Sequence, residues 1–227
     1  MKQLNIFCEG PTEQGFCVQV LQPHLFPHGD GLIHTLAVGE KDYHHVYGLG
    51  RHAKYEKIRR FIGNTIKQRR GPNVFFTTLS DLYGLPADFP GKDGNTYNAA
   101  DPNRYVLELE AAMLADIGHH QFIPHLQLHE YETMLFADPK AFEIAFEKRG
   151  AEIRQLMDIA DSVPTIEHIN QGRDTAPSKR IINIIPEYDG RKSSAGPDIA
   201  EYIGLATIRG KCPHVDRWLC ELESIIR

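Results

Sequence analysis

Apolar runs alternate with helical patterns over roughly the first 130 residues of the chain. Three of these runs have the length and the β-branched or aromatic content of buried strands: residues 3–8, 32–38 and 73–79. Apolar side chains at helical spacing recur after them, in residues 11–25, 55–66 and 102–117. Before the third helical pattern, Asp101 and Pro102 are typical of an N-cap and a first helical residue. The pattern predicts repeated strand–helix units.

A fourth strand is predicted over residues 122–128, and Pro124 favours an edge position or an early strand residue for it. Crossovers between parallel strands are right-handed and place helices on both faces of the sheet. We therefore predict an α/β core over residues 1–137, with a doubly wound, mainly parallel four-stranded sheet. Residues 138–227 carry prolines between short helical segments. They are expected to form a mostly helical C-terminal extension packed on the core as one structural unit.

The composition fits one globular unit and excludes a membrane protein. The chain has 227 residues, of which 41% are hydrophobic and 24% charged, an ordinary balance for a globular protein. No apolar run approaches the ~20 residues that span a bilayer. The chain enters a strand at once without a signal-peptide pattern, and its four cysteines show no C-x-x-C spacing. We expect a cytoplasmic protein with reduced cysteines.

Charge and histidine content narrow the range of ligands. Because the net charge is −5, any binding of nucleic acid must come from a local basic patch. The chain has twelve histidines, but His44-His45 and His119-His120 are adjacent pairs, and the segment after His129 lacks the second histidine of a zincin helix. Histidine spacing therefore does not indicate a zinc site.

Acidic residues follow three of the four predicted strands. Glu9 and Glu13 come after the first strand, Asp81 after the third, and Glu130 and Glu132 after the fourth. The carboxyl ends of parallel strands meet at one edge of a sheet, where open α/β folds bind their ligands. We therefore expect these carboxylates to converge on one site.

Carboxylates that converge repel one another, which raises their pKa values and costs stability unless a cation neutralises them. Mg²⁺ or Mn²⁺ suits such a site, because both ions prefer hard oxygen ligands. A metal held in this way can polarise a phosphodiester and lower the pKa of a bound water. The leading hypothesis is hydrolysis of a nucleic-acid backbone, with four metal ligands: Glu9, Asp81, Glu130 and Glu132.

Each carboxylate also has a structural alternative. Glu13 lies at the third position of the predicted helix, where glutamate often satisfies backbone amides. Asp81 suits the start of a turn, and Glu130 and Glu132 can form the solvated first turn of a following helix. A charge directly after a core strand needs a reason, so Glu9 is the hardest of the five to explain by structure alone.

Residues 8–13, Cys-Glu-Gly-Pro-Thr-Glu, resemble the E-G-x-T-E signature of the first strand in Toprim domains, especially those of overcoming-lysogenisation (OLD) nucleases. The whole chain is similar to a bacterial Toprim-like family of unknown function. Four further segments carry this similarity: residues 81–86, 127–132, 175–180 and 203–209. The resemblance implies a Toprim-like fold.

The resemblance also implies roles for two of the carboxylates. By similarity, Glu9 is a metal ligand or general base, and Asp81 is the first ligand of the Asp-x-Asp element. The second aspartate of that element is replaced by Tyr83. Glu130 or Glu132 would therefore have to supply the missing acidity.

Basic residues that suit a phosphate substrate occur in two places. Lys179 and Arg180 lie close to a predicted helix start, where Lys179 is the candidate for stabilising charge in the transition state. The second place is a predicted loop that interleaves aromatic rings with positive charge and suits base stacking: Tyr43, His44, Arg51 and Lys54. Both groups also fit an ordinary solvated surface.

Three functions are compatible with these residues. Similarity to OLD-like proteins implies a Mg²⁺- or Mn²⁺-dependent nuclease that acts on DNA or RNA in phage defence. We predict four catalytic residues for it: Glu9, Glu13, Asp81 and Lys179. Because the chain has no P-loop motif, the second hypothesis is an inactive Toprim-fold subunit or sensor beside a separately encoded ATPase. A phosphatase or small-molecule phosphotransferase would use the same carboxylates in a closed pocket. Each of the three functions is compatible with a homodimer.

Overall fold

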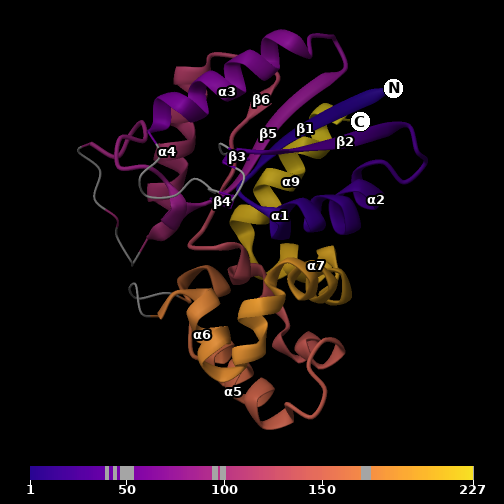
Figure 1. Ribbon diagram of the computed structural model, residues 1–227, viewed down its shortest axis with the longest axis vertical. Coiled ribbons are helices and arrows are strands. Elements are labelled where there is room, and N and C mark those ends of the chain that lie inside the picture. Colours follow the sequence, from indigo (N-terminus) through magenta and orange to yellow (C-terminus); the bar gives the residue numbers. More distant parts are fainter. Residues whose placement is uncertain are drawn as a thin grey trace.

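The computed structural model describes residues 1–38, 41–42, 45–46, 54–93, 97, 101–169 and 175–226. A sheet with its covering helices occupies the upper part of Figure 1, and a helical lobe that contains α5 and α6 lies below it. The strands are β1 (Lys2–Cys8), β2 (Gly31–Ala37), β3 (Lys41–Asp42), β4 (His45–Val46), β5 (Val74–Asp81), β6 (Phe122–Ile123) and β7 (Leu126–Gln127). The α-helices are α1 (Pro11–Phe16), α2 (Gln22–Leu25), α3 (Tyr55–Gln68), α4 (Pro102–Ile117), α5 (Gly150–Asp161), α6 (Pro177–Ile184), α7 (Lys192–Ile203), α8 (Leu205–Lys211) and α9 (Pro213–Ile226).

The main sheet has the strand order β2-β1-β5-β6, and β7 continues beside β5. All of its pairings are parallel. After β1 the chain runs to β2 on one side and then crosses to β5 on the other, so the order reverses between β1 and β5. Such a reversal leaves a crevice at the carboxyl ends of the two strands. The predicted α/β class with a mainly parallel sheet is confirmed.

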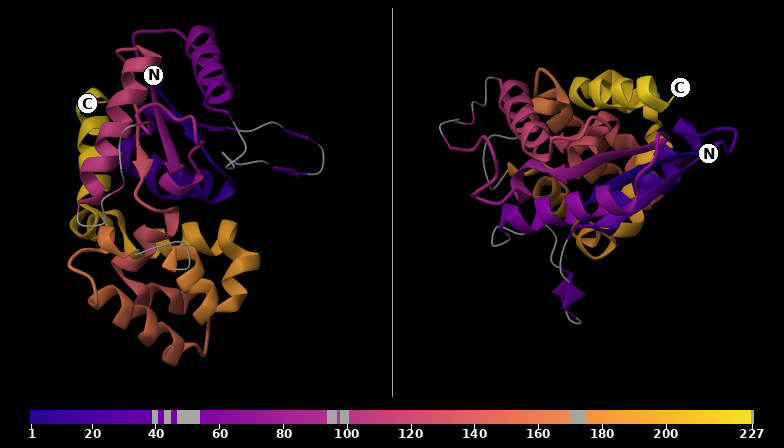
Figure 2. Two further views of the ribbon diagram at one scale, coloured as in Figure 1. Left: turned by 90° about the vertical axis from the view of Figure 1, so that its left-hand side faces the viewer. Right: turned by 90° about the horizontal axis from the view of Figure 1, so that it is seen from above.

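Helices cover both faces of the sheet because successive residues of β1 point to opposite sides. Leu4 and Ile6 belong to a buried cluster with residues of α1, α7 and α9. Phe7, the residue after Ile6, points to the other face. It belongs to a second cluster with Phe76 and residues of α3 and α4. The right-hand view of Figure 2 shows α3 and α9 on opposite sides of the sheet.

The predicted fourth strand is interrupted. Two short strands, β6 and β7, replace the continuous run expected over residues 122–128. Pro124 has no N–H to donate to a ladder, and the N–H of His125 donates to the hydroxyl of Thr78 at 2.8 Å instead of to a strand carbonyl. The same hydroxyl donates to the carbonyl of His125 at 2.9 Å. The strand therefore bends away from β5 at this point and rejoins it at Leu126.

The first predicted helix is not a continuous α-helix. Between α1 and α2, residues Cys17–Leu21 form a π-helical turn. Such turns are rare and occur often near functional sites. The predicted N-cap of α4 is confirmed, because the Asp101 carboxylate accepts the N–H of Arg104 at 3.1 Å.

The C-terminal helix α9 returns to the sheet. The indole N–H of Trp218 donates to the hydroxyl of Thr77 in β5 at 2.8 Å, and both groups are buried. Leu219 and Leu222 belong to the same buried cluster as Leu4 of β1. The extension thus packs on the core, while the boundary at residue 137 stays a prediction. Within the described ranges, we find no helix with both the length and the apolar character that a membrane span needs.

Candidate metal centre

A polar cavity of about 320 Å³ lies at the carboxyl ends of β1 and β5, where the strand order reverses. Its walls come from the β1–α1 turn, the end of β5, the segment after β7, and the first residues of α6 and α7. The lining residues are Glu9, Gly10, Pro11, Thr12, Glu13, Asp81, Glu130, Tyr131, Glu132, Ser178 and Lys192. The five acidic residues predicted to converge therefore meet in one cavity.

Glu9 and Asp81 are linked through the backbone of neighbouring strands. The N–H of Asp81 donates to Oε2 of Glu9 at 3.2 Å. Oδ1 of Asp81 in turn accepts the N–H of Tyr131 at 2.8 Å. A backbone amide of the sheet therefore orients Glu9, and the first amide of the 3-10 helix Tyr131–Ala137 orients Asp81. An ionised carboxylate accepts about four hydrogen bonds or ligands, so both groups keep capacity for a cation.

Gly84 supports the position of Glu9 by having no side chain. A Cβ built at Gly84 would lie 2.7 Å from both carboxylate oxygens of Glu9, which is closer than non-bonded atoms approach. We therefore expect Gly84→Ala to displace this carboxylate and lower the affinity for Mn²⁺ by about 10–100-fold, as changes beside metal ligands do. Isothermal titration calorimetry measures it. The control is Gly63→Ala in α3, where a Cβ would meet nothing within 4 Å, and equal affinity in the two variants would contradict this role.

Glu13 and Glu130 each accept a backbone amide at the start of a helix. Oε2 of Glu13 accepts the N–H of Gly10 at 2.8 Å, which is the capping role weighed above. Oε2 of Glu130 accepts the N–H of Ser178 at 2.9 Å, near the first residue of α6. Both side chains also line the cavity. Each of these two glutamates can therefore both cap a helix and belong to the acidic cavity.

Glu132 lies in a 3-10 helix, Tyr131–Ala137, and is buried. Its Oε1 accepts the hydroxyl of Tyr188 at 3.4 Å and lies 3.9 Å from Nζ of Lys192. The predicted solvated first turn is therefore wrong for Glu132, because burial removes it from solvent. Tight packing of α1 on α7 brings Lys192 to the cavity, since a Cβ at Gly15 would lie 2.5 Å from Cγ of Pro197.

Burial and mutual repulsion raise the pKa values of Glu9, Asp81 and Glu132. Burial, followed by the charge of Glu13, raises the pKa of Glu9 from 4.5 to about 8. Burial and then the charge of Glu9 raise the pKa of Asp81 well above its usual value. Burial raises the pKa of Glu132 to about 7, although Lys192 opposes the shift. Without a cation the cavity thus holds protons on acids that are ordinarily ionised at pH 7.

The donor set of the cavity is compatible with a hard cation. It consists of carboxylate oxygens, and Lys192 is the one cationic side chain among the described residues that line it. Five carboxylates opposite one ammonium leave an excess of negative charge that a divalent ion would neutralise. We therefore regard Glu9 and Asp81 as the centre of a candidate metal site, with Glu13, Glu130 and Glu132 around it.

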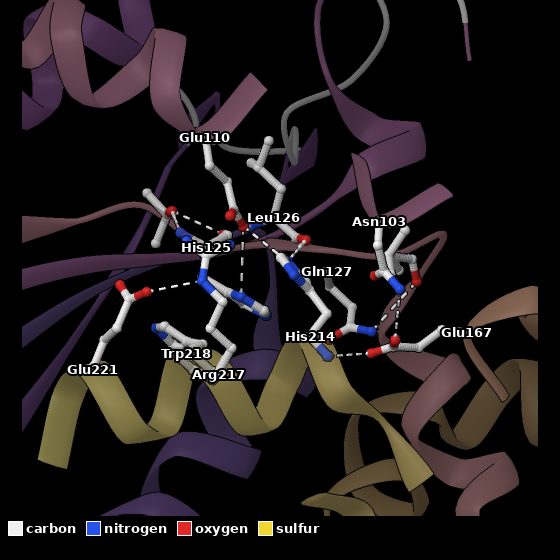
Figure 3. A network of polar contacts seen from close by, with 12 residues as sticks. Asn103, Glu110, His125, Leu126, Gln127, Glu167, His214, Arg217, Trp218 and Glu221 are labelled. Carbon is white, nitrogen blue, oxygen red and sulfur yellow. Dashed lines mark hydrogen bonds and ion pairs between the residues drawn. The ribbon is translucent and has the colours of Figure 1, made fainter. Parts of the chain in front are cut away.

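A second polar cluster lies apart from this cavity. Glu110, His125 and His214 are all buried, and one ligand atom from each lies within 4.8 Å of the others. Figure 3 shows the three side chains directed toward one another from α4, the β6–β7 connection and α9. This cluster could hold a metal ion. Histidine spacing did not indicate it because the three residues are far apart in the chain.

The predicted basic residues lie elsewhere. Lys179 is exposed on α6, and Arg180 donates from Nε to the carbonyl of Thr175 at 2.8 Å. Neither residue lines the acidic cavity. Lys54 is exposed directly before α3. The remaining three predicted contacts to nucleic acid lie outside the described residues: Tyr43, His44 and Arg51.

Lys192 was missed in the sequence because nothing near it in the chain points to a phosphate site. It lies beyond the segments that end the strands, and only the packing of α7 on α1 brings it to the carboxylates. Tyr83, in place of a second aspartate, has its hydroxyl 2.8 Å from Nδ1 of His129.

Most of the chain matches a protein family. No curated protein and no solved structure matches the chain. One family model, described as "Domain of unknown function (DUF4276)", matches residues 8–223. The match includes every residue of the acidic cavity and of the second cluster. The chain therefore belongs to the DUF4276 family.

Proposed function

We propose that this protein is a Mg²⁺- or Mn²⁺-dependent, Toprim-type nuclease that hydrolyses phosphodiester bonds of DNA or RNA. The observation that carries the proposal is the convergence of five carboxylates at the strand-order reversal, with one lysine opposite them. The pKa values of Glu9 and Asp81 are raised there. Carboxylate oxygens without nitrogen or sulfur donors favour hard ions, the class to which Mg²⁺, Mn²⁺ and Ca²⁺ belong.

The resemblance of residues 8–13 to the Toprim signature supports the same assignment. Its two glutamates, Glu9 and Glu13, both line the cavity, and Asp81 joins them from the neighbouring strand. A bound Mg²⁺ would polarise the phosphate and lower the pKa of a bound water.

The protein's own groups would position the ion and the substrate. Glu9 and Asp81, each held by a backbone amide, would hold the ion. Glu130 and Glu132 would provide the acidity that Tyr83 does not. Lys192 would offer positive charge to a phosphate oxygen at the opposite wall, the role predicted for Lys179 from the sequence. Lys179 and Arg180 would instead contact the substrate outside the cavity.

A cleavage assay tests this function. The full chain is incubated with supercoiled plasmid, single-stranded DNA and RNA in Mg²⁺, Mn²⁺ or EDTA. We expect cleavage of at least one substrate with metal, none with EDTA, and loss of more than about 100-fold in Glu9→Gln, a larger loss than changes beside the ligands cause. Glu143→Gln, at an exposed position, is the matched control. Metal-dependent cleavage that Glu9→Gln leaves unchanged would remove the site from the reaction.

A non-catalytic subunit or sensor, beside a separately encoded ATPase in phage defence, is the second candidate. The observation that favours it is Tyr83, whose hydroxyl is engaged with His129 where the Asp-x-Asp element would have a ligand. Binding of Mn²⁺ at the cavity, without cleavage of any of the three substrates, is the result expected from this candidate.

A further inference from the structure

The cluster of Glu110, His125 and His214 lies where helices from both faces of the sheet meet beside its edge strand. Glu110 belongs to α4, His125 connects β6 to β7, and His214 lies in the first turn of α9. Nε2 of His214 lies 2.9 Å from Oε1 of Glu110. Nδ1 of His125 lies 3.7 Å from the same oxygen. Three elements that are remote in the sequence therefore contribute one donor group each (Figure 3).

His125 is poorly satisfied in this arrangement. It is 1% exposed, and within the described part of the chain its Nε2 meets no hydrogen-bond partner. The distance of 3.7 Å from Nδ1 to Glu110 is too long for a hydrogen bond. Buried polar atoms are nearly always paired, so the unpaired Nε2 needs an explanation such as a water. An ion shared with Glu110 and His214 would bind the other ring nitrogen, Nδ1, which faces Oε1 of Glu110.

The distances between the donor atoms agree with a shared ion. Zinc–nitrogen and zinc–oxygen bonds of about 2.0–2.2 Å place two tetrahedral ligands about 3.3–3.6 Å apart. The observed separations of 2.9 and 3.7 Å lie on either side of that range. A cavity of about 10 Å³ adjoins all three side chains, the order of size that one water or ion needs.

The donor chemistry separates this cluster from the acidic cavity. Two imidazoles and one carboxylate form a set that zinc and related borderline ions favour, whereas Mg²⁺ favours oxygen donors alone. We propose that Glu110, His125 and His214 bind a zinc ion that fastens α9 to α4 and to the edge of the sheet. The bound ion replaces the proton that His214 shares with Glu110, and this proton is released to solvent. This inference does not depend on the nuclease function.

Trp218 makes the site directly observable. It is the single tryptophan of the chain, and its ring lies 4.2 Å from that of His125 at an interplanar angle of 9°. The EDTA-treated full chain is titrated with Zn²⁺, and separately with Co²⁺, in saturating Mg²⁺. We expect one equivalent of Zn²⁺ to change Trp218 fluorescence and raise the melting temperature by about 5 °C at excess metal. Bound Co²⁺ should show the visible absorption of a tetrahedral site.

Variants distinguish the two metal sites. Glu110→Gln and His214→Gln should lose the Zn²⁺-dependent fluorescence change, whereas His28→Gln, at an exposed position, should keep it. The double variant Glu9→Gln/Asp81→Asn should also keep it, because it alters only the acidic cavity. If His214→Gln does not fold, Glu110→Gln and the Co²⁺ spectrum of the unaltered chain show whether the cluster binds the ion. The proposal would be overturned if Zn²⁺ left the fluorescence and melting temperature of the unaltered chain unchanged. It would also be overturned if both cluster variants responded to Zn²⁺ as strongly as the unaltered chain does.

Discussion

Glu9→Gln is expected to raise the melting temperature of the metal-free protein at pH 8 by about 5 °C or more. The reason is that Glu9 is held among other carboxylates, so its ionisation destabilises the fold. Its pKa is raised from 4.5 to about 8, first by burial and then by Glu13. A difference of this size corresponds to a few kcal/mol of folding free energy. Glutamine fills the same space without the charge.

The direction of the pH dependence follows from the same pKa shift. Between pH 4.5 and about 8 the unfolded chain has lost the proton of Glu9, while the folded chain retains it. The free energy of unfolding therefore falls as the pH rises through this window. Below pH 4.5 Glu9 is protonated in both states, and the variant should match the unaltered protein.

Thermal unfolding in EDTA, measured from pH 4 to pH 9, tests this prediction. Glu143→Gln is again the control, and it should follow the unaltered protein at every pH. Addition of Mg²⁺ at pH 8 should stabilise the unaltered protein more than Glu9→Gln, because the ion neutralises the charge that the variant lacks. If Glu9→Gln is less stable than the unaltered protein at pH 8 in EDTA, the charge of Glu9 does not destabilise the fold and the prediction is wrong.

Asp81→Asn is expected to lower the affinity for Mn²⁺ by more than about 100-fold while leaving the fold intact. The loss should exceed the 10–100-fold of changes beside ligands, because an anionic ligand itself is removed. The fold should persist because the asparagine Oδ1 can still accept the N–H of Tyr131, as Asp81 does at 2.8 Å.

Calorimetric titration with Mn²⁺ measures the affinity, and far-UV circular dichroism checks the fold. The matched control is Asp158→Asn at an exposed position of α5, which should bind Mn²⁺ like the unaltered protein. Affinity that is the same in both variants would place the ion elsewhere.

The parts of the fold that depend on local sequence could be predicted. The strand β1, the strand β5 and the capped start of α4 each have their signal within a few residues. The convergence of Glu9 with Asp81 followed from a general property of parallel sheets, and the structure places both in one cavity. By contrast, the break between β6 and β7 depends on the hydroxyl of Thr78, which lies in another strand.

Features made by long-range packing could not be predicted. Lys192 reaches the cavity only because Gly15 and Pro197 let α1 and α7 approach closely. His125 and His214 meet only because α9 returns to the edge of the sheet. A pattern within one segment contains no information about contacts between distant segments. The cluster of Glu110, His125 and His214 therefore had no signal in the sequence, and histidine spacing did not indicate a metal site.

A crystal of the full chain soaked in Mn²⁺ shows whether the acidic cavity is a divalent-metal centre. We expect an anomalous difference peak between the carboxylates of Glu9 and Asp81, at the roughly 2.0–2.2 Å typical of ions with oxygen ligands. Full soaking without a peak at these two residues, or with a peak only at other acidic groups of the surface, would contradict it.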